Sequence, residues 1–439
     1  MGSNDLQLEM NFSEKQQNSF RKTVESGAFS LLIESSVPGP QLPARDAMKQ
    51  LRVLEEEIAG ISALPCGMAI VDRPGNPEGW SGIEFASQMS EELRDRHLVY
   101  LSGFNRDPGE IDRQLAIAGN SGNFNIACVS GDLGEGAAAR TDSGQIFKKV
   151  MAKKGFFGGV TVNPYQYDPW ALTAQYSKLG ARILSDAGFF IAQTGWDTLK
   201  LQSLSWYLLS HDFYAPGFVR LLFLTPERMK HLLEHGQPGI IIGKELRRTM
   251  ERELKLDRVL FDVAQFTRLE RQAAACRILG FSGIQLCGAD HPKIVAEAVN
   301  AVRKGIDSCT TFEDFLECYH NGMAESEVNS FHLKFQLFDR VLKRPYPFDD
   351  PPSPAELPDP GVTFWEKTAV RFSRKDAFAK NRQGVSTAMK CPKHNTLGPC
   401  GGVRHDGRCE SGSQECVYRK WFRFAHACDA LSGIEKEMI

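Results

Sequence analysis

The sequence lacks an excess of either charge: 52 Lys and Arg side chains are balanced by 54 Asp and Glu, for a net charge of −2 at pH 7. This balance offers no basic surface for nucleic acid and no acidic tail. No apolar run reaches the length of a membrane span. The polar start, Met-Gly-Ser-Asn-Asp-Leu, lacks the apolar core of a signal peptide. We therefore expect a cytoplasmic globular protein that binds neither nucleic acid nor membrane.

Cysteine is plentiful, and its distribution divides the chain. Six of the 11 cysteines are scattered before residue 320, and five fall after residue 390. In the cytosol these are expected to be free thiols or metal ligands rather than disulfides. Proline-rich residues 344–361 remove backbone donors and favour a semi-rigid linker. We predict an N-terminal arm (1–25), a large domain (26–343), this linker (344–361) and a small cysteine-rich domain (362–439).

Eight short apolar segments in the large domain have the character of buried strands. The stretches between them carry the i, i+3/i+4 apolar spacing of helices packed on a sheet. Eight alternations over roughly 300 residues favour a (β/α)8 TIM barrel of class α/β. A doubly wound sheet is the alternative, but it calls for a glycine-rich turn after its first strand, where the sequence has Glu34-Ser-Ser-Val. The expected strands are Ser30–Ile33, Gly67–Val71, Leu98–Leu101, Asn125–Val129, Gly159–Val162, Phe189–Ala192, Val219–Leu222 and Gly283–Leu286.

Polar side chains stand where four of these strands end. Glu34 follows Leu31-Leu32-Ile33, and Asp132 follows the fourth strand after Ser130-Gly131. Thr161 and Asn163 end the fifth strand, and Gln193 ends the sixth. The carboxyl ends of barrel strands meet at one face, where such barrels place their active sites. Turn chemistry alone also places Asp and Asn after strands, but four cases together predict one polar site.

With these polar strand ends, residues 26–300 resemble the methylenetetrahydrofolate reductases, a family of flavin-dependent barrels. Glu34 matches the first-strand glutamate, Ser130-Gly131-Asp132-Leu133 resembles an Arg-Gly-Asp-Leu segment, and Asp186-Ala-Gly188 with Gln193-Thr194 resembles an Asp-Ala-Gly…Thr-Gln strand. The resemblance implies FAD as cofactor and a tetrahydrofolate derivative as substrate. It makes Glu34 the general acid that protonates folate N10, with a pKa raised by burial. It places Asp132 near the flavin and the pterin, and Gln193 beside the folate.

The sequence also departs from the family pattern. Ser130 replaces an arginine and Leu184 a lysine of the flavin site, which leaves Arg182 as a nearby substitute. Thr161 and Asn163 stand where the family has an Ala-Tyr-Pro flavin contact, and Met229 where a phenylalanine packs on the substrate. These departures change residues that bind flavin and the nicotinamide in the family. A protein electron donor is therefore an alternative to direct use of NAD(P)H.

The final segment carries four regularly spaced thiols in a sequence rich in glycine, proline and polar residues. Cys391, Cys400, Cys409 and Cys416 are separated by eight, eight and six residues, unlike the Cys-x-x-Cys pairs of a zinc ribbon. Four thiolates can hold Zn²⁺ or a [4Fe–4S] cluster. The pattern Cys-Pro-Lys…Gly-Pro-Cys-Gly-Gly…Cys-Glu…Cys is similar to a C-terminal domain of some methylenetetrahydrofolate reductases, and related iron–sulfur subunits favour a cluster. The aromatic and basic stretch from Tyr418 is expected to pack this domain on the barrel.

The sequence supports three functions from different classes. The first is an oxidoreductase of one-carbon metabolism, interconverting 5,10-methylene- and 5-methyltetrahydrofolate through bound flavin. The second is a folate-binding accessory or electron-transfer subunit with a degenerate flavin site. A flavin-free pterin-binding methyltransferase is a third, weaker hypothesis.

Overall fold

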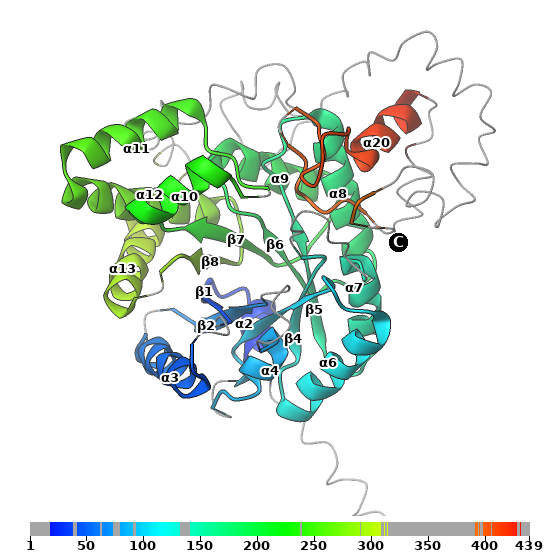
Figure 1. Cartoon of the computed structure of the whole chain (residues 1–439), viewed down its shortest axis with the longest axis horizontal. Coiled ribbons are helices and arrows are strands. Elements are labelled where there is room, and N and C mark those ends of the chain that lie inside the picture. The colour runs from blue at the N-terminus through cyan, green and yellow to red at the C-terminus, as the bar shows by residue number, and fades with distance from the viewer. Residues whose placement is uncertain are drawn as a thin grey trace, which may run out of the picture.

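The computed structural model has one closed barrel of eight parallel strands that neighbour one another in chain order (Figure 1). The described residues are 18–37, 42–61, 64–72, 80–90, 94–131, 141–237, 239–289, 291–308, 311, 314, 391–393, 395, 398–404, 406–427 and 431. The predicted TIM barrel and all eight expected strands are confirmed. The strands are β1 (Ser30–Ser36), β2 (Cys66–Val71), β3 (Leu98–Ser102), β4 (Asn125–Val129), β5 (Phe157–Val162), β6 (Phe189–Ala192), β7 (Gly217–Leu222) and β8 (Gly283–Cys287).

Helices follow the strands and form the outer ring, beginning where the sequence supplies a cap. At several helices an aspartate side chain accepts hydrogen bonds from the first free backbone N–H groups. Proline stands in the first turn of some of them, where its missing N–H is not needed. The main helices of the ring are α3 (Ala44–Gly60), α4 (Gly82–Ala86), α6 (Pro108–Ser121), α7 (Ser143–Met151), α8 (Pro169–Ile183), α9 (Thr198–Ser210), α12 (Arg258–Ile278) and α13 (Pro292–Ser308).

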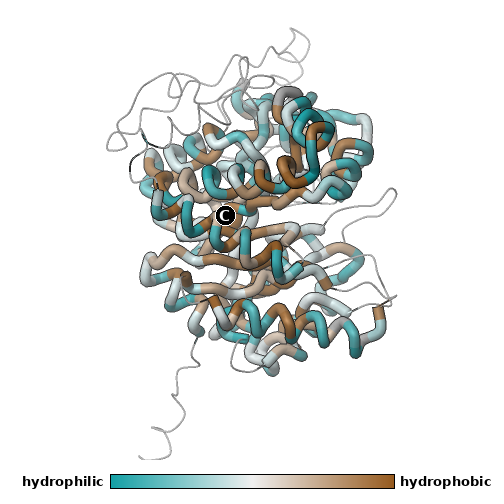
Figure 2. The backbone as a smooth tube through the Cα atoms, turned by 90° about the vertical axis from the view of Figure 1, so that its left-hand side faces the viewer, coloured by the Kyte–Doolittle hydropathy of each residue, from teal (hydrophilic) through white to brown (hydrophobic). Residues whose placement is uncertain are grey.

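Apolar segments run through the interior, whereas the surrounding helices alternate apolar and polar turns (Figure 2). The amino-terminal end of the barrel is closed by α2 (Ser19–Glu25), which belongs to the predicted N-terminal arm. Its Phe20 contacts the rings of Phe157, Phe189 and Phe218 at centroid distances of 6.1, 5.5 and 5.7 Å. Aromatic contacts of this kind add to the area they bury. Residues 1–17 lie outside the described part.

Two extra helices, α10 (Pro226–His235) and α11 (Lys244–Leu256), stand between β7 and α12. Their positions agree with the amphipathic pattern of the sequence. Helix α12 begins at Arg258, directly after α11, because the Asp257 side chain caps it by accepting from the N–H groups of Val259 and Leu260. No helix in the described ranges is both long and apolar enough to cross a membrane.

The cysteine-rich segment ends in helix α20 (Val417–Ala427), which packs against α8 (Figure 1). Tyr418, Trp421 and Phe422 are buried in one apolar cluster with Trp170 and Ala174 of α8. The guanidinium of Arg419 donates to Asp168, the N-cap of α8, over 2.7 Å. The expected packing of the Tyr418 stretch on the barrel is therefore confirmed. The predicted linker, 344–361, and residues 362–390 lie outside the described residues.

Candidate functional site

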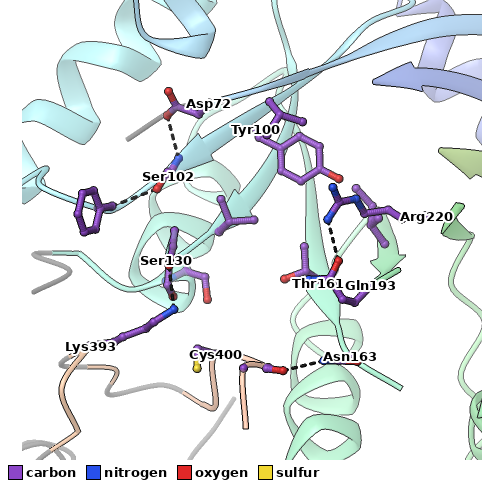
Figure 3. Close-up of a pocket in the computed structure, with 18 of the residues that line it drawn as sticks. Asp72, Tyr100, Ser102, Ser130, Thr161, Asn163, Gln193, Arg220, Lys393 and Cys400 are labelled. Atoms are coloured by element: carbon purple, nitrogen blue, oxygen red, sulfur yellow. Dashed lines mark hydrogen bonds between the residues drawn. The ribbon is translucent and has the colours of Figure 1, made fainter. Parts of the chain in front are cut away.

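A cavity of about 850 Å³ opens at the carboxyl ends of the strands. Its volume lies in the range of roughly 300–1,000 Å³ that ligand sites occupy. Seven strands or strand ends contribute to its wall, mostly with polar side chains (Figure 3). The barrel residues concerned include Glu34, Asp72, Tyr100, Ser102, Ser130, Thr161, Asn163, Gln193 and Arg220.

Glu34 meets three donors at a single carboxylate oxygen. Its Oε2 accepts from Arg220 Nη2 at 2.8 Å, from Gln285 Nε2 at 2.5 Å and from the Cys287 thiol at 2.9 Å. The carboxylate is 14% exposed and the guanidinium 18% exposed. Such an ion pair is stabilised when further hydrogen bonds satisfy the partners, as Gln285 and Cys287 do here.

The pKa of Glu34 is lowered, contrary to the sequence expectation. Burial by itself raises this pKa, but the charge of Arg220 and the hydrogen bonds from Cys287, Arg220 and Gln285 outweigh burial. The expected raised pKa is wrong because a cation from β7, which the sequence did not reveal, outweighs burial. The surroundings of Glu34 therefore favour the ionised carboxylate.

Gln193 lies on the other side of Arg220. Its Oε1 accepts from Arg220 Nη1 at 2.7 Å and from the backbone N–H of Thr194 at 3.0 Å. Arg220 therefore joins two predicted site residues, Glu34 after β1 and Gln193 after β6. Thr161 lines the same cavity at the end of β5.

Asn163 lines the cavity but also holds the cysteine-rich segment in place. Its Nδ2 donates to the carbonyls of Gly401 at 2.7 Å and Gly239 at 3.1 Å. Gln166 donates to the same Gly401 carbonyl at 2.8 Å. A side chain at Gly401, whose φ is +98°, would meet Asn163 Cβ at 3.3 Å, so glycine suits this contact.

The cysteine-rich segment forms part of the cavity wall. Lys393, Cys400, Gly401, Gly402 and Glu410 all line the barrel cavity. Lys393 and Glu410 form an ion pair whose side chains are 4% and 6% exposed, and Lys393 Nζ also donates to the Gly131 carbonyl at 3.0 Å (Figure 3). The segment and the barrel thus share one site.

The four predicted metal ligands surround a second, small cavity of about 20 Å³. Cys391, Cys400, Cys409 and Cys416 all line it, and Cys400 alone among them also lines the barrel cavity. Backbone N–H groups donate to three of these sulfurs: Lys393 and Asn395 to Cys391, Gly402 to Cys400, and Tyr418 and Arg419 to Cys416. Hydrogen bonds of this kind surround metal-bound thiolates.

The four thiols do not form a ready-made coordination site. No group of three or more His, Cys, Asp or Glu side chains in the described part of the chain is close enough to hold a metal ion. Burial raises the pKa of Cys391 and Cys400, and it raises that of Cys416 to about 12. The donor set is nevertheless that of a thiolate metal site, with four sulfurs around one small space.

Two predicted contacts lie elsewhere. Arg182 does not line the cavity; it is buried on α8, with its guanidinium 5.8 Å from the centre of the Phe147 ring. Met229 is buried on the inner face of α10 in an apolar cluster with Trp196 and Leu224, also away from the cavity wall. Asp132 lies outside the described residues.

Sequence reasoning missed the residues in the middle of the strands. Arg220 stands in Gly217–Leu222, and Gln285 stands opposite it in β8. A polar residue inside an otherwise apolar strand was the available signal, because such a residue must have a partner inside the barrel. Asp72, at the end of β2, was also missed; it is held by Arg106 and by the N–H groups of Gly82 and Ser102.

Residues 376–439 match a family model described as methylene-tetrahydrofolate reductase C terminal. This match confirms the resemblance of the cysteine-rich segment to that family. The matched region contains all four thiols and the whole C-terminal wall of the barrel cavity. No curated protein matches the chain.

Three of the solved structures that match the chain do so at low identity. One is an uncharacterized protein from Clostridium thermocellum, described as binding two copies of 5-methyl-5,6,7,8-tetrahydrofolic acid; it is 14% identical, with a TM-score of 0.47, over 65% of this chain and 98% of its own. A putative dihydrodipicolinate synthetase from Pseudomonas aeruginosa is 13% identical, with a TM-score of 0.29, over 63% and 99%. Phospho-2-dehydro-3-deoxyheptonate aldolase from Francisella tularensis is 11% identical, with a TM-score of 0.30, over 68% and 96%.

Proposed function

We propose that this chain, whose residues 376–439 match the methylenetetrahydrofolate reductase C-terminal family, is an oxidoreductase of that type. It would interconvert 5,10-methylene- and 5-methyltetrahydrofolate by hydride transfer through a bound flavin. One observation carries the proposal: residues of the matched segment line the same barrel cavity as Glu34 and Gln193. The family-specific segment is therefore part of the ligand site.

Glu34 can handle the proton that this reaction moves. When the five-membered ring of the folate closes, N10 loses a proton, and when it opens N10 gains one. An ionised Glu34 is ready to accept that proton, and Arg220 stabilises the ionised form. In the opposite direction the same carboxyl would take up a proton first and then return it to N10.

The cavity can accommodate the ring system of a flavin, whose chemistry would be hydride transfer. Thr161, Ser130 and Gln193 are the described residues that would bond its polar edge. The cations that line the described cavity wall, Arg220 and Lys393, are each paired with a carboxylate. The described wall therefore supplies no separate partner for a flavin phosphate.

That pairing favours a second candidate function, in which the chain is a folate-binding accessory or electron-transfer subunit. In this role the barrel would bind the folate, and a partner protein would carry the flavin or deliver the electrons. The flavin content of the purified chain distinguishes the two candidates, because only the first requires bound flavin.

For the cysteine site we propose a single metal ion held by Cys391, Cys400, Cys409 and Cys416. The four sulfurs line one small cavity of about 20 Å³, and their side chains would have to draw closer to share an ion. Backbone N–H groups already point at three of the sulfurs, as a thiolate site requires. Zinc is an ion that four thiolates commonly hold in structural sites. A [4Fe–4S] cluster is the alternative, and it would make the segment a redox relay.

The test is an absorption spectrum of anaerobically purified full-length protein, with zinc and iron analysis on the same sample. Flavin bands near ~375 and ~450 nm would support the reductase. Turnover of 5-methyltetrahydrofolate should then fall by about 10²- to 10⁴-fold in Glu34→Gln, the usual scale for loss of a proton-transfer group. A protein that binds folate but contains no flavin would refute the reductase and favour the accessory role instead. A protein with neither flavin nor folate binding would refute both.

A further inference from the structure

Arg220 is placed so that one guanidinium contacts two ligand-facing side chains. It extends from β7 and donates Nη2 to Glu34 Oε2 at 2.8 Å and Nη1 to Gln193 Oε1 at 2.7 Å. The guanidinium is planar and presents its donors in a rigid fork, so it fixes both partners at once. A lysine could not hold both in the same geometry.

The two partners are left with complementary free groups. Glu34 Oε2 already receives Arg220, Gln285 and Cys287, whereas Oε1 makes no hydrogen bond with any described residue. Arginine only donates, so the amide oxygen of Gln193 must be the atom that faces Arg220. The Gln193 NH₂ group is then directed elsewhere, and it too makes no hydrogen bond over the described ranges. The cavity therefore presents an acceptor and a donor on the two sides of Arg220.

We propose that Arg220 is the positioning residue of this cavity: it presents Glu34 as an acceptor and Gln193 as an amide donor, so that together they recognise a ligand with an N–H group for Glu34 and a C=O group for Gln193. The inference rests on the proposed function in taking a reduced folate as that ligand, with N10–H at Glu34 and the pterin carbonyl at Gln193. A flavin ring also carries N–H and C=O groups, so the experiment includes both. Phosphate or carboxylate ligands would instead meet the negative charge of Glu34.

The charged and titratable groups around Glu34 set its response to pH. Among the described residues these are Arg220 on β7, Cys287 on β8 and Tyr100 on β3. Asp72 on β2 lines the same cavity and is paired with Arg106. Without Arg220, burial would dominate and the pKa of Glu34 would rise, because burial is the largest influence on it. A protonated Glu34 would lose its capacity to accept from a ligand N–H.

The experiment compares wild type with Arg220→Met and Arg220→Lys. Arg113→Met is the matched control, since Arg113 is a surface arginine of α6 that is 54% exposed. Dissociation constants are measured by calorimetry from pH 5 to pH 8 with three probes. The probes are 5-formyltetrahydrofolate, riboflavin, and p-aminobenzoylglutamate, which lacks the heterocycle.

We expect wild type and Arg113→Met to bind 5-formyltetrahydrofolate with little dependence on pH. Arg220→Met should bind it about tenfold more weakly, as for loss of a hydrogen bond involving a charge. Its affinity should recover as pH rises and Glu34 ionises. Arg220→Lys should keep the flat pH profile, because it keeps the charge, with intermediate affinity. p-Aminobenzoylglutamate keeps the amine that corresponds to N10 but lacks the pterin carbonyl, so it should lose less affinity in Arg220→Met than 5-formyltetrahydrofolate does.

Contrary outcomes separate the two proposals. If wild type binds riboflavin with this dependence on Arg220 but no folate, the positioning role stands and the folate function fails. If Arg220→Met weakens all three probes equally, or leaves the pH profile flat, Arg220 has only a structural role. If wild type binds neither heterocycle, the recognition proposed here is wrong.

Discussion

His97 shows at the scale of one residue how burial sets a protonation state. It is 1% exposed, and its Nδ1 accepts from the backbone N–H of Met68 at 3.0 Å. Burial, aided by the charge of Arg96, lowers its pKa from 6.5 to about 3. The ring is therefore neutral in the folded protein at any pH at which the protein is expected to work.

This histidine should make the protein sensitive to mild acid. Between pH 6.5 and a pH of about 3, His97 is protonated in the unfolded chain but stays neutral in the folded chain. Across that window the free energy of unfolding should fall by about 1.4 kcal/mol per pH unit from this group. His97→Asn, which keeps an acceptor and does not titrate, should flatten the slope in urea unfolding from pH 7 to pH 4.5. Exposed His231 provides the control, His231→Asn; equal slopes in wild type and His97→Asn would refute the assignment.

At the scale of an element, the segment between β5 and α8 connects the two parts of the chain. Asn163 and Gln166 both donate to the Gly401 carbonyl, and Lys178 of α8 donates to the Pro399 carbonyl at 3.0 Å. The backbone on both sides of Cys400 is thus fixed by barrel residues. Gln166 is held in turn by Lys200 of α9, whose Nζ donates to its carbonyl at 3.0 Å.

Removing these donors should release the cysteine-rich segment while the barrel stays folded. Each of Asn163→Ala and Gln166→Ala removes one hydrogen bond to Gly401, worth about 1 kcal/mol. The double variant should show faster hydrogen exchange at Gly402 and Val403, with exchange in α13 unchanged. Gln88→Ala, at an exposed glutamine, is the control. Unchanged exchange in the double variant would mean that the remaining contacts, such as Lys178 to Pro399 and the α8–α20 packing, are enough to hold the segment.

Across the whole molecule, the proposed metal site and the barrel cavity meet at Cys400. This thiol lines both cavities, whereas Cys391 lines only the small one. The two sites should therefore depend on each other, since binding that orders one wall favours ligands that need it. The cysteine-rich segment would be a working part of the ligand site as well as a stabilising attachment.

Cys400→Ser and Cys391→Ser should separate these effects. Both variants should lose metal and melt earlier, because loss of a structural site costs on the order of several kcal/mol. Only Cys400→Ser should also change the affinity of the metal-free protein for 5-formyltetrahydrofolate, relative to wild type treated with a chelator. Metal content, melting temperature and folate affinity are measured on the same samples by metal analysis, thermal melting and calorimetry. Full metal content in both variants would exclude the four-thiolate site.

Much of the fold and part of the site could be read from the sequence, because they depend on local signals. Alternating apolar strands and amphipathic helices specify the barrel, and caps such as Asp168 mark where helices begin. Strands of a parallel barrel end at one face, so Glu34, Asn163 and Gln193 could be placed at one cavity. Four thiols in a glycine-rich segment are likewise visible without a structure.

Tertiary structure decided which long side chains meet. The family resemblance predicted Arg182 and Met229 at the site, yet the helix faces that carry them point toward other neighbours. Arg220 reaches Glu34 across 186 positions of sequence, and that contact reverses the direction in which burial alone would shift the carboxyl pKa. A side chain's charge state and partners depend on what surrounds it in space, and only the closed barrel brings those surroundings together.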